Sequence, residues 1–232
     1  DTLFAAIITR LAALAPGVVK PIVDGFPRWE DGQALDASPP FLLTSAFPSA
    51  GEVRFFPKPE PPTRQVGEKP PSDSGVRPKD LKKLTFVSET IFRGLLDGDS
   101  LGEWSGKRIA LQNGKVWLAS IERDQLPERW RSLSDDVLEQ QSVWKTVQRP
   151  RVAIDRATDA SNIFHSGHTV YAEDCGMWFA IAWRDPKREI GEWSIEELVD
   201  RALDDLALAG LGGLRSIGMG ACAIDAAGPL SL

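Results

Sequence analysis

The sequence is poor in the residues that build redox, metal and covalent catalytic sites. Its 232 residues include only two cysteines and two histidines. Cys175 and Cys222 could form one disulfide but no framework of the secreted type, so we expect a reducing compartment, the cytoplasm. His165 and His168 are spaced H-x-x-H with no Cys or carboxylate cluster beside them, which leaves a metal site short of ligands. We therefore expect neither a metal nor a cofactor.

Long apolar runs and a strong charge of one sign are also missing. The longest apolar stretch, residues 3–15, is interrupted by Thr9 and Arg10 and is shorter than the roughly 20 residues that cross a bilayer. It also lacks the basic start of a signal peptide, so we expect no membrane contact. The formal net charge of −6 argues against a generic polyanion binder.

The charges are unevenly distributed along the chain. Residues 54–93 contain nine Lys or Arg and five Asp or Glu, whereas residues 192–208 contain six acids and one base. A local basic surface on an acidic chain suits a nucleic-acid-binding subunit of an assembly. It suits an ordinary solvated surface equally well, so charge alone leaves both readings open.

Helical patterns at the two ends enclose strand-like segments. Apolar residues recur at helical spacing over residues 3–14, and Pro16-Gly17 ends that pattern. Ser194-Ile195-Glu196-Glu197 is a capping-box sequence, which predicts a helix from residue 194 to Gly210. The order helix, strand pair, loop, strand pair, helix, glycine loop and strand predicts an α+β, ferredoxin-like (RRM-like) sheet whose first strand is missing.

The segments between these helices predict loops and hairpins. Seven prolines in residues 57–78 predict an exposed loop, and Asn113-Gly114 predicts a two-residue hairpin turn. A second hairpin is expected through Asp174-Cys175-Gly176, joining strands at residues 169–173 and 177–183. A last strand is expected at residues 221–224. We predict one domain over residues 1–232, with residues 97–148 as an insertion that contains the first hairpin.

The glycine-rich segment at residues 210–220 is the most informative one. Nucleotide-binding glycine loops follow a strand and precede a helix, whereas this one follows a helix and lacks the Gly-Lys-Ser/Thr ending. Glycines beside Arg215 and Ser216 offer a flat surface on which a sugar-phosphate backbone can lie. The alternative is a tight connection between a helix and a strand.

His165 lies in a small, polar segment, residues 161–167, and His168 follows it directly; we expect this segment to be a flexible loop. One histidine near a 2′-hydroxyl could act as a general acid in RNA cleavage. Phe164 or His165 could instead stack on a base, and Phe164 could simply fill a core. Asp155 has no second carboxylate to form a catalytic pair, and a salt bridge to a neighbouring Arg is its commoner role.

The order of the short motifs resembles one family. Residues 1–4, Asp-Thr-Leu-Phe, are similar to the helix start that follows the first strand in RAMP-type CRISPR proteins. Ser45-Ala46-Phe47-Pro48 with Phe56-Pro57-Lys58-Pro59 resembles a motif pair of the fourth Csm subunit of type III-A effector complexes. Further matches are Lys82-Lys83 with Phe86, residues 151–156 with Phe164, and Gly212-Gly213-Leu214-Arg215-Ser216-Ile217-Gly218-Met219-Gly220.

The resemblance implies a non-catalytic RAMP subunit of the Cas-five group that binds the 5′ handle of crRNA. Its implied neighbours are the large polymerase-cyclase subunit and a backbone RAMP subunit, with target RNA met indirectly. The family has a strand before the position of Asp1 and a second ferredoxin-like half, which we expect to be absent from this chain. The alternative is a RAMP endoribonuclease that processes precursor crRNA with His165 or His168 as acid or base. The RNA-binding residues expected are Lys58, Lys79, Lys82, Lys83, Arg151, Arg156, Phe164, His165, Gly212, Gly213, Arg215, Ser216 and Gly218.

Overall fold

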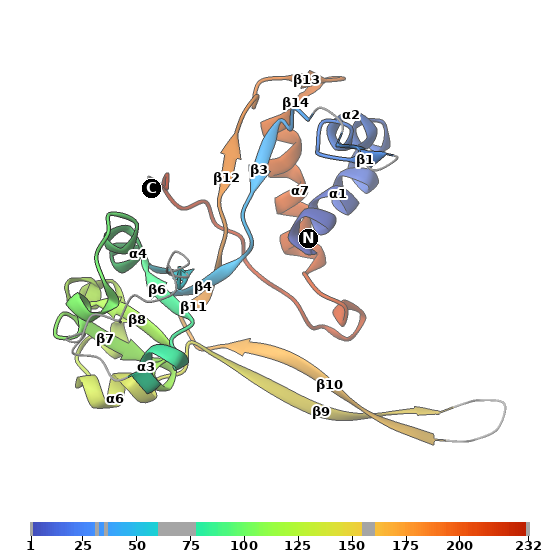
Figure 1. Cartoon of the computed structure of the whole chain (residues 1–232). Helices are drawn as coiled ribbons and strands as arrows, with labels where there is room; N and C mark the ends of the chain where they lie inside the picture. Colours follow the sequence, from blue (N-terminus) through green and yellow to red (C-terminus); the bar gives the residue numbers. More distant parts are fainter. Residues whose placement is uncertain (1, 31–32, 35–36, 60–77, 155–160, 231–232) are drawn as a thin grey trace. The chain divides into compact units, whose positions relative to one another are not determined.

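The computed structural model describes residues 2–30, 33–34, 37–59, 78–154 and 161–230. The chain divides into two compact units, one of residues 1–46 with 179–232 and one of residues 47–178 (Figure 1). Both units combine helices with strands, so the predicted α+β class is confirmed. Each unit is described by itself below.

The unit of residues 47–178 is built on a six-stranded sheet with the order β11-β4-β5-β6-β8-β7. All neighbouring strands are antiparallel except β6 and β8, which are parallel. The strands are β4 (Phe47–Ala50), β5 (Val53–Pro57), β6 (Phe86–Ser88), β7 (Arg108–Leu111), β8 (Val116–Ala119) and β11 (Cys175–Trp178).

Strand β8 shows why this sheet is stable. All four of its residues are buried, because successive side chains enter cores on opposite faces of the sheet. Val116 and Leu118 join one core with side chains of α5 (Glu128–Arg131) and α6 (Asp135–Gln140). Trp117 and Ala119 join the other core with α4 (Glu89–Leu96). The other helical segments described in this unit are α3 (Pro78–Lys83) and the 3₁₀ turns η2 (Leu101–Trp104), η3 (Gln112–Gly114) and η4 (Ser120–Gln125).

The unit of residues 1–46 and 179–232 is mainly helical. Its core joins α1 (Thr2–Leu14) to α7 (Ile195–Ala209), and Arg10 forms an ion pair of 3.4 Å with Asp205 across the two helices. The helical stripes predicted from the sequence supply this core, with Ile7 and Leu11 fully buried. The remaining elements are η1 (Pro16–Val18), α2 (Val19–Val23), β1 (Trp29–Glu30), β2 (Gln33–Ala34), β3 (Phe41–Leu43), β12 (Ile181–Trp183), β13 (Glu189–Ile190), β14 (Trp193–Ser194) and η5 (Arg215–Ile217).

The capping box predicted at the start of α7 is confirmed. The Ser194 hydroxyl accepts a hydrogen bond from the Glu197 backbone N–H at 3.3 Å, and Glu197 accepts one from the Ser194 N–H at 2.9 Å. The backbone N–H of Ser194 and then its hydroxyl lower the pKa of Glu197 below its usual value. The carboxylate therefore stays charged at the positive end of the helix dipole.

The predicted hairpin at Asn113-Gly114 forms between β7 and β8, but its turn is longer than two residues, and a second predicted hairpin and one predicted strand are wrong. The connection between β7 and β8 has four residues, Gln112 to Lys115, because Leu111 pairs with Val116. The expected hairpin through residues 174–176 does not form: β11 pairs with β4 instead, held by Trp178, whose indole N–H donates to the Phe55 carbonyl at 3.0 Å. Residues 221–224 form no strand with the described part of the chain, since the loop before them closes on itself.

The predicted loop at residues 161–167 is also wrong. These residues belong to β10 (Ser161–Tyr171), which pairs with β9 (Trp144–Ile154). The pairing extends an expected short strand at residues 152–154 to eleven residues and supplies a backbone partner for the small polar residues. Such residues lack a strand signature of their own, so their strand conformation depends on the partner.

One side chain of the β7–β8 connection holds the start of β9. The side-chain oxygen of Gln112 accepts hydrogen bonds from the N–H groups of Val143, at 2.7 Å, and Trp144, at 3.4 Å. Its side-chain N–H donates to the Trp144 carbonyl at 2.8 Å. The Gln112 amide thus replaces the neighbouring strand that these backbone groups lack. Gln112 pays for this position with a φ of 55°, in the left-handed region.

We predict that Gln112→Ala lowers the free energy of unfolding by about 1–3 kcal/mol, because the buried N–H of Val143 loses its acceptor. Alanine has the same difficulty with a positive φ as glutamine, so the difference isolates the side-chain hydrogen bonds. Urea unfolding measures it, with Gln148→Ala, an exposed amide on β9, as the matched control. Equal stability of the two variants would show that the Gln112 amide is dispensable.

Candidate nucleic-acid interface

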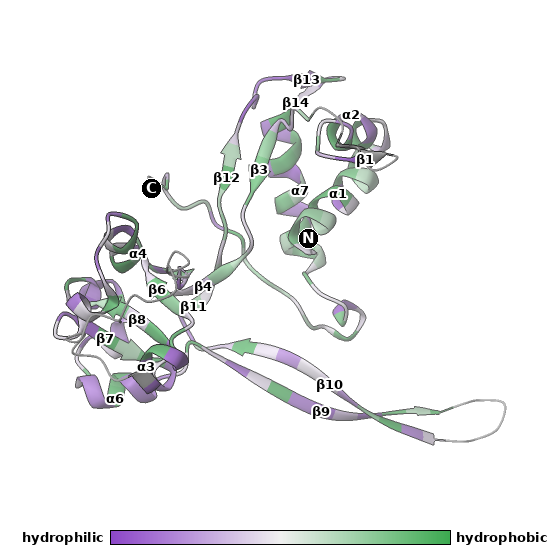
Figure 2. Cartoon of the chain, viewed as in Figure 1, coloured by the Kyte–Doolittle hydropathy of each residue, from purple (hydrophilic) through white to green (hydrophobic). Residues whose placement is uncertain are grey.

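Strands β9 and β10 form a long two-stranded arm. They pair antiparallel without a break, from Trp144 opposite Tyr171 to Ile154 opposite Ser161. Figure 1 shows them as a ribbon of two strands, and Figure 2 shows hydrophilic and hydrophobic residues following one another along both. Because residues that lie opposite each other share a face and successive residues alternate, this register sorts every side chain of the arm.

One face of the arm carries all of its lysine and arginine side chains. Arg151 lies opposite Phe164, and Arg149 lies opposite Ser166. His168 lies opposite Val147, on the diagonals to Arg149 and Lys145. We call this surface the basic face; its members are Lys145, Val147, Arg149, Arg151, Ala153, Asn162, Phe164, Ser166, His168 and Val170.

The positive charge of the basic face is not neutralised within the described part of the chain. Neither β9 nor β10 contains an Asp or a Glu. None of the three cations forms an ion pair with a described residue, and the Nε of Arg151 is buried without a hydrogen-bond partner there. Phe164 lies among these charges with 46% of its surface exposed, so it is no core residue of this unit. Cations around an exposed aromatic ring are suited to single-stranded nucleic acid.

The opposite face of the arm has a different character. His165 lies there, opposite Pro150, so the predicted pair of Phe164 and His165 is divided between the two faces. Three apolar side chains on this face are more than half exposed, namely Val152, Ile154 and Ile163. His165 and His168 also face opposite ways, because they are three positions apart on one strand.

The predicted lysines gather at α3. Lys79, Lys82 and Lys83 are exposed on this helix, and the ammonium of Lys58 donates to the Leu81 carbonyl at 3.4 Å. The helix leads into β6, whose Phe86 packs edge-to-face on Trp144, at 5.7 Å between ring centroids. The cluster therefore lies in the same unit as the arm and close to its base. Arg156 and most of the predicted Pro-rich loop lie outside the described residues.

The glycine loop lies in the unit of residues 1–46 and 179–232. Its two ends, Leu211 and Gly220, are hydrogen-bonded to each other and form what we call its neck, whereas the glycines between them have open space around them. The N–H of Leu211 donates to the Gly220 carbonyl at 2.8 Å. A Cβ on Gly220 would overlap the Leu211 carbonyl, and Gly220 has a φ of 80°, so glycine is required at the neck. Around Gly212 and Gly213 a Cβ would meet nothing within 4 Å.

The functional side chains of the glycine loop are exposed. Arg215 and Ser216 open the 3₁₀ turn η5, and Gly218 ends it with a left-handed φ of 80°. Arg215 forms no ion pair with Asp204 or Asp205, the alternative that its position after an acidic helix offers, and Asp205 instead pairs with Arg10. Its charge is therefore available at the surface.

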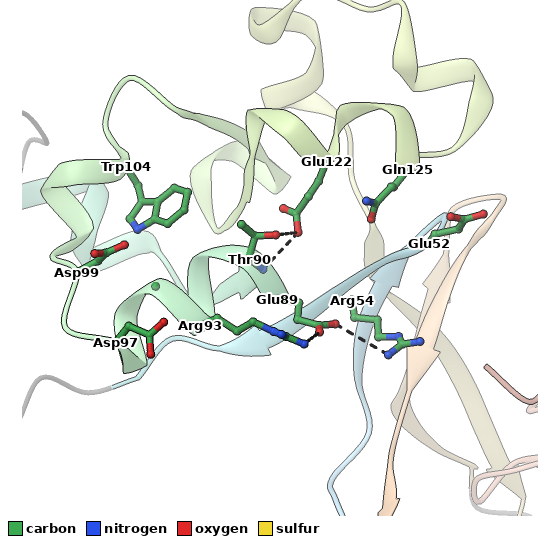
Figure 3. Close-up of a pocket in the computed structure, with 11 residues that line it drawn as sticks. Glu52, Arg54, Glu89, Thr90, Arg93, Asp97, Asp99, Trp104, Glu122 and Gln125 are labelled. Atoms are coloured by element: carbon green, nitrogen blue, oxygen red, sulfur yellow. Dashed lines mark hydrogen bonds and ion pairs between the residues drawn. The ribbon is translucent and has the colours of Figure 1, made fainter. Parts of the chain in front are cut away.

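The unit of residues 47–178 also has a hollow of about 530 Å³, which the sequence did not predict (Figure 3). Its lining has five acidic residues, Glu52, Asp97 and Asp99 among them, against two arginines, and this excess of negative charge disfavours phosphate. Glu122 is 5% exposed, and its carboxylate accepts hydrogen bonds from the Thr90 hydroxyl, at 2.7 Å, and from the Ala119 N–H, at 2.8 Å. A carboxylate committed in this way supports the sheet and is not free to act as an acid or base.

The described residues offer little for covalent or metal chemistry. Burial raises the pKa of the Cys175 thiol to about 11, so it stays protonated and weakly nucleophilic at neutral pH. Neither cysteine is disulfide-bonded. No group of three or more His, Cys, Asp or Glu within the described residues is placed to hold a metal ion. None of the described helices combines the length and the apolar character needed to cross a membrane.

Comparison with known proteins identifies the fold. No family model matches the sequence, and no curated protein does. Among solved structures, the chain is similar to one in the Csm3–Csm4 subcomplex of a type III-A CRISPR-Cas interference complex, with a TM-score of 0.62 and 17% identity. That match covers 92% of this chain and 59% of the other. A chain of a Csm1–Csm4 cassette in complex with AMPPNP matches with a TM-score of 0.46 and 19% identity, over 89% of this chain and 60% of that one.

The chain thus spans about three fifths of the length of each of these two proteins. At this level of identity the likeness concerns the fold. The ferredoxin-like α+β fold predicted from the order of elements, and the family resemblance of the motifs, are both supported by a structure from a CRISPR interference complex that follows almost the whole of this chain.

Proposed function

We propose that this protein is a non-catalytic subunit of a type III CRISPR effector complex that binds crRNA through the basic face of the β9–β10 arm. The observation that carries the proposal is the arm's row of unneutralised cations around an exposed phenylalanine. The fold likeness to a chain of a Csm3–Csm4 subcomplex supports the choice of assembly.

The chemistry of the basic face favours single-stranded RNA over other anions. Phosphates are bound by Lys145, Arg149 and Arg151, whose charges need a counter-ion from outside the described chain. Phe164 offers a ring on which an unpaired base can stack. His168, on the same face, adds a hydrogen-bond donor in place of the predicted His165.

The α3 lysines and the glycine loop are proposed as further RNA contacts. Lys79, Lys82 and Lys83 extend the positive surface near the base of the arm, while Lys58 is partly occupied with α3 itself. In the other unit, Gly212 and Gly213 leave room for a sugar-phosphate backbone beside Arg215 and Ser216. Two further points follow from the sequence resemblance and belong to the same proposal: the 5′ handle is the bound segment, and the large polymerase-cyclase and backbone RAMP subunits are the neighbours. The cytoplasm as the location, expected from the low cysteine content, also belongs to it.

The arrangement of the histidines favours binding over cleavage. General acid and base groups must both come within hydrogen-bond reach of the reacting atoms. His165 and His168 lie on opposite faces of a two-stranded ribbon, so they do not converge on one phosphate. We therefore propose that RNA bound to the basic face stays intact; the endoribonuclease alternative would have to rely on one histidine alone, His168, which is the histidine on that face.

We predict that replacing both Arg149 and Arg151 by Ala weakens RNA binding and lowers the slope of log K against log salt by about one unit per lost contact. Affinity is measured with a crRNA 5′-handle oligonucleotide at several salt concentrations. The control is the double variant of Lys187 and Arg188 to Ala, which removes the same charge from an exposed segment of the other unit. Equal effects of the two double variants would show that RNA binding depends on net charge alone and that the arm is not part of the interface.

We predict that Gly213→Val keeps the melting temperature close to that of the wild type, because a Cβ there meets open space, yet weakens RNA binding by blocking the backbone path. Gly220→Ala is the contrasting variant and should distort the loop neck and lower the melting temperature. Both properties are measured on both proteins. A Gly213→Val protein that binds RNA as tightly as the wild type would make the loop a connector only.

A further inference from the structure

A hollow of about 590 Å³ lies at the base of the arm, next to Lys145 at the end of the row of cations just described. It is formed by residues at the start of β9, at the end of β10 and around α5 and α6. Three aromatic residues contribute to its wall, Trp130, Trp144 and Tyr171. Its size falls within the range of about 300–1,000 Å³ that is usual for small-molecule sites.

The aromatic residues of this hollow are held in place. Trp130 is only 3% exposed and belongs to the core of the unit. Trp144 is held edge-to-face on Phe86, with an angle of 86° between the rings, and Tyr171 lies directly opposite it in the arm. Gln112 fixes the backbone of Trp144 on both its N–H and its carbonyl. Trp130 thus backs the hollow from the core, and a planar ligand would meet the half-buried rings of Trp144 and Tyr171, which need little ordering on binding.

The polar groups of the hollow have few partners. The side chains of Gln140, Ser142 and Lys145 form no hydrogen bond or ion pair with described residues. Arg129, by contrast, donates to the carboxylate of Glu173 at 2.5 Å and to its carbonyl at 2.7 Å, so its charge is already matched. The hollow thus combines aromatic walls with a free amide, a free hydroxyl and one free ammonium.

These features favour one class of ligand. The lining contains no Asp or Glu, which gives a cationic ligand no partner. A single free cation is too few for a cluster of phosphates. A nucleobase matches what remains, since its faces stack on aromatic rings and its edges accept and donate hydrogen bonds. Lys145 belongs to both the hollow and the basic face, so the two surfaces are continuous.

We propose that this hollow binds one unstacked base of the RNA strand that lies along the basic face. The inference rests on the proposed function, because it takes the strand from that surface. Lys145 would bind the phosphate where the strand passes from the basic face to the hollow, and the base turns inward against the aromatic wall. The arm then sets the register of the RNA as well as its affinity.

The test is a scan of the crRNA 5′-handle oligonucleotide, with one abasic nucleotide at each position in turn, against the full-length chain. We expect one position whose abasic form binds the wild type about tenfold more weakly, the usual effect of losing one stacked base. The same position should show little loss in Tyr171→Leu or in Gln140→Ala, because the base there has already lost its contacts. Gln140 is exposed, so its variant tests the site even if Tyr171→Leu affects folding.

Gln148→Ala is the matched control, an exposed amide of the same arm that does not line the hollow, and it should keep the wild-type scan. A wild-type protein that binds the intact oligonucleotide but shows a flat scan, or a scan that the two hollow variants leave unchanged, would overturn the base site while leaving the proposed function in place. Failure to bind the intact oligonucleotide at all would overturn both.

Discussion

The unbroken register between β9 and β10 is the constraint on which the functional account depends. Side chains alternate along a strand, so a slip of one residue would exchange the two faces of the arm. In the register observed, Arg149, Arg151 and Phe164 lie together, and His165 lies behind them. The same register separates the two histidines and therefore bears on both binding and catalysis.

The register is anchored at the base of the arm, where the arm meets the core. Gln112 holds the backbone of Val143 and Trp144, and Phe86 packs on the Trp144 ring. Those contacts come from the sheet whose strand β8 is buried on both faces. The arm can thus expose charged and aromatic residues over most of its length because its base is fixed to a well-packed unit.

Features encoded by neighbouring residues were predictable from the sequence. The capping box at Ser194 and Glu197 and the buried stripe of α1 both follow from short patterns, and the structure confirms them. The glycine loop was also located, but the sequence could not separate the neck glycine Gly220 from the open Gly213. That distinction depends on which backbone comes close to each residue.

Features that depend on distant pairing were missed. Small polar residues around Ser166 indicate a loop, and only the opposite strand makes them part of an arm. Phe164 and His165 lie on opposite faces of the arm because side chains alternate along a strand. A segment predicted to be a loop carries no such expectation. The hydrogen bond from the Gln112 side chain to the Trp144 carbonyl joins residues 32 positions apart, and no local sequence pattern predicts it.

The central claim is that RNA lies on the basic face of the arm. Ultraviolet cross-linking of a crRNA 5′-handle oligonucleotide to the full chain, with the linked residues located by mass spectrometry, tests it most directly. The account predicts cross-links at Phe164 and His168 and none at His165 or Ile163. Cross-links at His165 and Ile163, with Phe164 and His168 unmodified, would contradict it.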